Sequence, residues 1–230
     1  MQNIITDLDR RDILRYLGYR GSALPPNIDQ LIEECVQETL KIITPKYRYA
    51  LFDLDFGDGA IYVKGTGLVL TGKSITRNLN GCSGAYLMAC TIGLEHERYL
   101  RQMMVIRPDK GVVLDSCGSV AAEAVAEYTN DQIKSLAAQN GYFCRSRFSP
   151  GYGDLPLSCQ RPLLDALRAD RTMGLTVGSG NLLAPNKSIT ALVGVCAEPA
   201  EDQQRPCDAC LKRMDCEFLR RDQTCYSKRS

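Results

Sequence analysis

The chain has 230 residues and a formal net charge of +1, from 28 basic and 27 acidic side chains. This balance gives no general attraction to nucleic acid or to an anionic membrane. No apolar run reaches the ~20 residues of a membrane-spanning helix, and the acidic N-terminal segment does not resemble a signal peptide. With 44% hydrophobic residues the chain can bury a sizeable core, so we expect a soluble cytoplasmic protein without a nucleic-acid or membrane partner.

The N-terminal part predicts two helices followed by short strands. Thr6 and Asp9 resemble a capping box, and apolar residues then recur at helical spacing. A second helical stripe begins near Asn27 and is stopped by Pro45. Alternating and β-branched runs separated by glycines come next. The expected elements are helices over 6–18 and 27–43, strands near 47–51, 61–63 and 68–70, and a short helix over 71–79.

The C-terminal part mixes helices and strands without a regular βαβ period. We expect strands over 85–92, 175–177 and 188–195, and helices over 94–106, 112–139 and 160–169, the second of them rich in alanine. This irregular order favours an α+β fold with a mixed or antiparallel sheet. The composition becomes polar after Ala197, which predicts one domain over 1–196 and a linker with a Cys-rich tail over 197–230.

The 11 cysteines divide into two groups. Seven are scattered, mostly among apolar neighbours, and we interpret them as buried or partly buried free thiols in a reducing compartment. They are Cys35, Cys82, Cys90, Cys117, Cys144, Cys159 and Cys196.

The other four cysteines, Cys207, Cys210, Cys216 and Cys225, lie in the tail. Four thiolates this close together can surround one zinc ion or hold one iron–sulfur cluster, and metal binding would supply folding free energy to a segment with little core. The spacing matches no standard motif, so zinc and iron–sulfur remain open beside incidental cysteines in a tail without metal.

His96 is the only histidine. It stands among charged residues, and we expect it on an exposed helix face. Because the chain has no other histidine, a Ser-His-Asp or Cys-His catalytic set would have to include His96. A position on the surface argues against that role. Zinc sites with two or three histidines are also excluded.

A formal phosphate-loop match runs from Gly67 to Gly72-Lys73-Ser74. Such a loop requires small flexible residues between a strand and a helix. Here Leu68-Val69-Leu70 is typical of a strand, so we favour a hairpin and keep nucleotide binding through Lys73 and Ser74 as an alternative.

Two features could bind a small charged ligand. Glu123 and Glu127 share one face of the alanine-rich helix, where they form either a solvated acidic stripe or an acid that faces a cationic ligand. The run Arg147-Phe148-Ser149-Pro150-Gly151-Tyr152-Gly153-Asp154 is a loop stiffened by proline and glycine. Its backbone can approach a ligand closely while Arg147 anchors a carboxylate or phosphate.

The run from Arg147 to Tyr152 resembles the R-x-x-P-G-Y signature of the activation domain of cobalamin-dependent methionine synthase. Four further stretches agree in the same order: Thr91 to Glu95, Ala122 to Glu127, Met173 to Leu175, and Pro185 to Gly194. The similarity is good over about 85 to 195 and loose over the first 80 residues. It implies a curved α+β domain with a twisted, mainly antiparallel sheet and flanking helices.

The resemblance also implies a function. That domain binds S-adenosylmethionine and docks over a corrinoid cofactor, which it helps to reactivate by reductive methylation. By motif position, Arg147 would contact the ligand's carboxylate, Pro150 and Gly151 would shape the loop, Tyr152 would line the methyl-transfer face, and Glu123 would balance the amino or sulfonium charge. The expected cofactors are S-adenosylmethionine and cobalamin held by the partner.

This chain lacks a recognisable corrinoid domain, so the resemblance implies action on a separate corrinoid-binding protein or on methionine synthase subunits. A low-potential electron donor is then required, and an iron–sulfur cluster in the tail could serve. The alternative is a non-catalytic, metal-tailed adaptor that binds a corrinoid protein.

Overall fold

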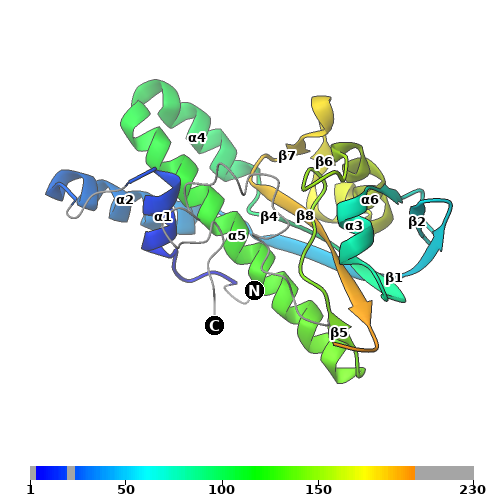
Figure 1. Ribbon diagram of the computed structural model, residues 1–230. Helices are drawn as coiled ribbons and strands as arrows, with labels where there is room; N and C mark the ends of the chain where they lie inside the picture. The colour runs from blue at the N-terminus through cyan, green and yellow to red at the C-terminus, as the bar shows by residue number, and fades with distance from the viewer. Residues whose placement is uncertain (1–3, 20–23, 200–230) are drawn as a thin grey trace.

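The computed structural model describes residues 4–19 and 24–199. A six-stranded antiparallel sheet with the order β3-β2-β1-β4-β8-β5 carries helices on both faces (Figure 1). The α+β class and the mainly antiparallel sheet are therefore confirmed. The strands are β1 (Lys46–Gly57), β2 (Ala60–Val63), β3 (Val69–Thr71), β4 (Gly84–Thr91), β5 (Phe143–Cys144) and β8 (Ser188–Cys196), with β6 (Thr176–Val177) and β7 (Leu183–Ala184) forming a small separate pair.

The helices fall into two groups, one on each face of the sheet. No helix in the described ranges is long and apolar enough to cross a membrane. Those on the first face are α1 (Arg10–Tyr16), α2 (Pro26–Ile42), α4 (Leu94–Ile106) and α5 (Pro108–Gln139), and those on the second are α3 (Lys73–Asn78), α6 (Gln160–Leu167) and α7 (Ala169–Met173).

The central strands β4 and β8 separate two hydrophobic cores. Every residue of β4 is buried, and successive side chains of a strand point to opposite faces. Met88 and Val193 therefore join the core under α5, while Leu87 and Leu192 join the core under α6. Continuous apolar runs suit strands that are covered on both faces.

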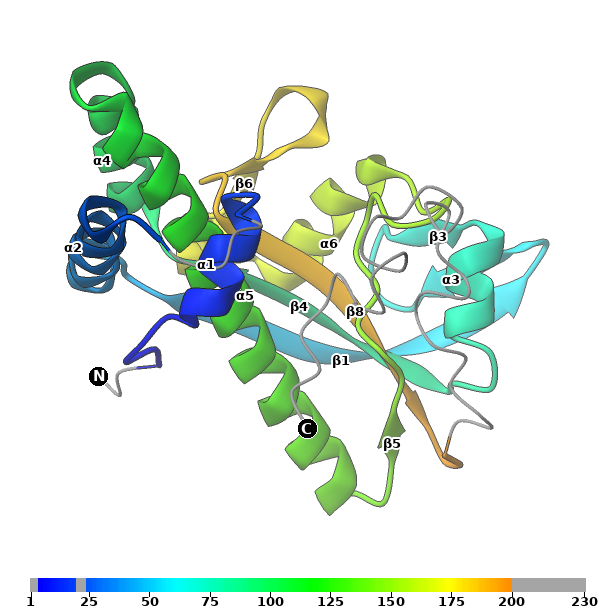
Figure 2. The same ribbon diagram turned by 60° about the vertical axis from the view of Figure 1, so that its left-hand side comes forward.

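Helix α5 crosses the sheet diagonally, and α1, α2 and α4 gather around its N-terminal half (Figure 2). It begins at Pro108, earlier than expected, because proline is tolerated in the first turn of a helix. The expected helix over 160–169 is divided at Arg168, whose φ of 51° breaks the helical path between α6 and α7.

The expectation that His96 is exposed was wrong. The residue has 0% exposure, in the interface between α4 and α5, and neither ring nitrogen has a hydrogen-bond partner among the described residues. A Cβ atom at Gly118 would lie 2.3 Å from the imidazole Cε1. The missing side chain of Gly118 thus makes the space for the ring, a long-range relation that the sequence around His96 does not reveal.

The expectation for the scattered cysteines was right for five of the seven. Cys35, Cys90, Cys117 and Cys159 are buried free thiols and Cys144 is partly buried. Burial raises the pKa of the first three to about 12, so they are protonated and unreactive. Cys82 and Cys196 were wrongly expected to be free: they form a disulfide that links the turn before β4 to the end of β8.

Replacing Gly118 by alanine should lower the free energy of unfolding by about 1–3 kcal/mol, because the new methyl group collides with the buried His96 ring. Gly67→Ala is the control, since a Cβ there meets no atom within 4 Å. Urea denaturation measures both variants. Equal stability of Gly118→Ala and wild type would show that α4 and α5 are not closely packed at this point.

Acid should weaken the fold through His96. Burial lowers the pKa of this imidazole to about 4, below its ordinary value of 6.5, so the unfolded chain binds the proton more readily than the folded one. Stability from the neutral ring is complete above pH 6.5 and is lost as the pH falls toward 4. Urea denaturation across this range should show a smaller loss in His96→Leu than in wild type, and parallel curves would contradict the assignment.

Candidate functional site

The loop that follows β5 is fixed to strand β8. The Arg145 N–H donates to the Gly194 carbonyl at 2.8 Å, and Phe148 and Leu192 exchange backbone hydrogen bonds of 2.9 and 2.8 Å. Because side chains alternate along this extended segment, Phe148 packs on the core below the sheet. Its neighbour Arg147 points instead to the face covered by α5, where it meets that helix.

Arg147 lies between the two acidic residues of α5. Its Nη2 donates to Glu123 Oε2 at 3.2 Å and to Glu127 Oε2 at 3.1 Å. The Arg147 side chain is 22% exposed, whereas Glu123 and Glu127 are 45% and 32% exposed. Nε and Nη1 of Arg147 have no hydrogen-bond partner among the described residues. The arrangement combines one cation with two anions and leaves both signs of charge accessible to a ligand.

The turn after Arg147 presents an aromatic ring to solvent. Gly151 has a φ of +90°, a conformation that favours glycine, and its N–H donates to the Leu155 carbonyl at 2.8 Å. Pro150 is buried, whereas Tyr152 is 59% exposed. The Tyr152 ring makes an edge contact with Phe148, with centroids 6.4 Å apart.

Tyr16, at the end of α1, joins this group and was missed by sequence reasoning. Burial raises the pKa of its phenol, and the charge of Glu123 on α5 contributes in the same direction. Asp12, one turn earlier, is paired with Arg15 at 3.1 Å. The sequence of α1 contains no signal that would have placed Tyr16 here, because its neighbour Glu123 belongs to another helix.

Asp154 holds the loop against the start of α3. Its carboxylate accepts from the N–H groups of Lys73 at 2.6 Å and Ser74 at 2.9 Å. A Cβ atom at Gly72 would lie 2.6 Å from Asp154 Oδ1. The backbone groups that a phosphate would need are therefore occupied by this carboxylate, and β3 fills the position of the flexible loop. The geometry does not favour the nucleotide-binding alternative.

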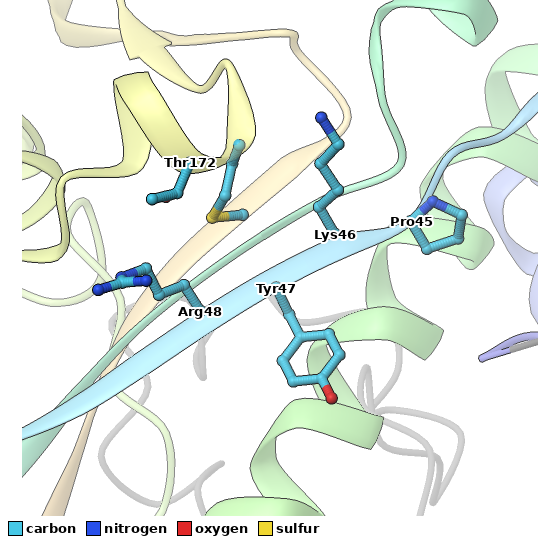
Figure 3. A pocket seen from close by; sticks show the side chains of 6 residues that line it. Pro45, Lys46, Tyr47, Arg48 and Thr172 are labelled. Carbon is cyan, nitrogen blue, oxygen red and sulfur yellow. The ribbon is translucent and has the colours of Figure 1, made fainter. Parts of the chain in front are cut away.

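The expected metal ligands Cys207, Cys210, Cys216 and Cys225 lie outside the described residues. Within 4–19 and 24–199, no group of three or more His, Cys, Asp or Glu side chains is placed to hold a metal ion. A shallow pocket of about 410 Å³ lies on the opposite face of the sheet from Glu123, between β1 and α7 (Figure 3). It contains none of the residues that the sequence predicted for ligand binding.

No protein-family model and no curated protein matches the chain. Thirteen chains of solved structures do match. One of them is described as the crystal structure of the MetH reactivation domain bound to AdoHcy; it has a TM-score of 0.64 and 14% sequence identity, and the match covers 94% of this chain and 82% of that one. The chain therefore has the fold of that reactivation domain, as its motifs indicated.

Removing the Asp154 carboxylate should lower the melting temperature, because two N–H groups of α3 lose their acceptor. Asp154→Ala tests this at pH 7 by circular dichroism, with the exposed Asp165→Ala as control. Hydrogen bonds from Ser74 and Lys73 lower the Asp154 pKa from 3.8, so its stabilisation is present above that value and is lost at lower pH. A melting temperature equal to that of Asp165→Ala would contradict a stabilising role of Asp154 at the start of α3.

Proposed function

We propose that this protein binds S-adenosylmethionine beside Arg147 and supports reductive methylation of a corrinoid cofactor on a partner methyltransferase. The observation that carries this function is the Arg147 guanidinium held between Glu123 and Glu127, next to the Pro150-Gly151-Tyr152 turn. It occurs in a chain with the fold of a reactivation domain that was solved with AdoHcy.

The charges of the site suit the ligand. S-adenosylmethionine carries one carboxylate, one ammonium group and one sulfonium group, a net charge of +1. One guanidinium and two carboxylates give the site a net charge of −1. Nε and Nη1 of Arg147 can donate to the ligand's carboxylate, while Glu123, the more exposed of the two acids, faces the ammonium or sulfonium group. The residues present therefore fit the ligand.

The protein's task would be to position the ligand rather than to transfer protons. When bound, S-adenosylmethionine supplies an already activated methyl group. Gly151 and the buried Pro150 fix the turn, and the exposed Tyr152 ring can cover the ligand and exclude water. The burial of His96 away from this loop does not weaken the proposal, because no general base is needed.

We further propose that the corrinoid belongs to a separate corrinoid-binding protein or to methionine synthase subunits. Reductive methylation needs one electron besides the methyl group, and a low-potential donor must supply it. An iron–sulfur cluster held by Cys207, Cys210, Cys216 and Cys225 would suit that task, whereas zinc there would only fold the tail. We also propose a cytoplasmic location, because five of the seven described cysteines are free thiols of the kind that persist in a reducing compartment, although Cys82 and Cys196 are joined.

Calorimetric titration with S-adenosylmethionine, under anaerobic conditions, should show saturable binding to the wild type. Arg147→Ala should weaken binding by about tenfold or more, because charge-assisted hydrogen bonds to the ligand's carboxylate are lost. Glu123→Gln should weaken binding as well, because it removes the negative charge that faces the ligand's cationic groups.

Arg48→Ala is the matched control, since this exposed arginine lies on the other face of the sheet. Circular dichroism of each variant separates loss of ligand from loss of fold. No binding by the wild type, also with a corrinoid-loaded partner present, would overturn the S-adenosylmethionine site and favour the non-catalytic adaptor.

A further inference from the structure

Strand β1 has a free edge along its first half. Its residues from Lys46 to Asp53 pair with β4, but β2 pairs only with Leu54–Gly57. No described strand therefore pairs with residues 46–52 on their second edge. Such an edge presents a row of N–H and C=O groups that can pair with another extended chain.

The pocket between β1 and α7 opens beside this edge. Its lining includes Lys46 and Arg48 from β1, together with Thr172 and Met173 from α7. Figure 3 shows the Lys46 and Arg48 side chains on the side of the strand where Thr172 lies, and Tyr47 on the opposite side. The edge therefore has two distinct flanks, one cationic with a pocket and one aromatic.

The charges on the cationic flank are not neutralised locally. Lys46 and Arg48 form no ion pair with a described residue, and both are exposed. On the other flank, Tyr47 and Tyr49 are half-buried and stack with centroids 6.4 Å apart. A strand added here would meet two positive charges on one face and two aromatic rings on the other.

We propose that the free edge of β1 binds an extended acidic segment of a partner protein as an additional antiparallel or parallel strand. Backbone hydrogen bonds would supply affinity and the alternating side chains would supply specificity. Acidic residues two apart would face Lys46 and Arg48, and the apolar residue between them would pack on the tyrosines. A second copy of this chain is a poorer occupant, because its own β1 would bring two more cations to the edge.

This surface is independent of the S-adenosylmethionine site. Glu123, Arg147 and Tyr152 belong to α5 and to the loop along β8, whereas the edge of β1 lies beyond β4 from β8. Failure of one proposal therefore leaves the other intact.

The probe is a fluorescein-labelled peptide of alternating glutamate and valine, about seven residues long to match a typical strand. Fluorescence anisotropy with the full chain should show saturable binding. The double variant Lys46→Glu, Arg48→Glu should weaken binding by about tenfold or more. The control variant Lys134→Glu, Arg77→Glu makes the same change of charge at two exposed positions away from this edge and should bind like wild type.

Two further measurements distinguish an added strand from simple attraction of charges. The same peptide with N-methylated backbone amides cannot complete a ladder and should bind more weakly. Hydrogen exchange of the backbone in residues 46–52 should slow when the unmodified peptide is added. No saturable binding, equal binding of the N-methylated peptide, or unchanged exchange in residues 46–52 would each overturn the proposal.

Discussion

The packing of α5 on the central strands determines where the rest of the site can lie. Gly118, Ala121, Ala122 and Ala126 are buried along this helix, and such small side chains let it approach the sheet and its neighbouring helices closely. Glu123 and Glu127 occur on the same stretch but at the flank of the contact, so they are half-covered rather than buried. Apolar packing holds the helix in place, so the positions of Glu123 and Glu127 do not depend on their hydrogen bonds to Arg147.

Strand β8 connects this helix to the loop that carries Arg147. Ala191, Val193 and Val195 belong to the core under α5, while the backbone of Leu192 and Gly194 holds the loop through Phe148 and Arg145. Strand β8 therefore fixes the positions of both α5 and the loop. The Arg147 guanidinium meets the carboxylates of Glu123 and Glu127 because β8 positions both the loop and the helix, although 20 or more residues separate them in the chain.

Local patterns were enough to predict much of the fold. The helix over 94–106 and the strand over 85–92 have strong periodicity and occur within a residue of where they were expected. The residue types of the site, Arg147 with Glu123 and Glu127, were also indicated, but their direct pairing was not, since it depends on β8. The contact of Asp154 with α3 and the position of Tyr16 likewise join distant segments, and no local signal encodes them.

The fit of His96 against Gly118 has a consequence for how such a sequence can change. A residue larger than glycine at position 118 destabilises the interface unless position 96 has already lost its ring, and a smaller residue at 96 alone leaves an empty space between the helices. The two positions are therefore epistatic: each substitution is destabilising when it occurs alone and is tolerated once the other has occurred.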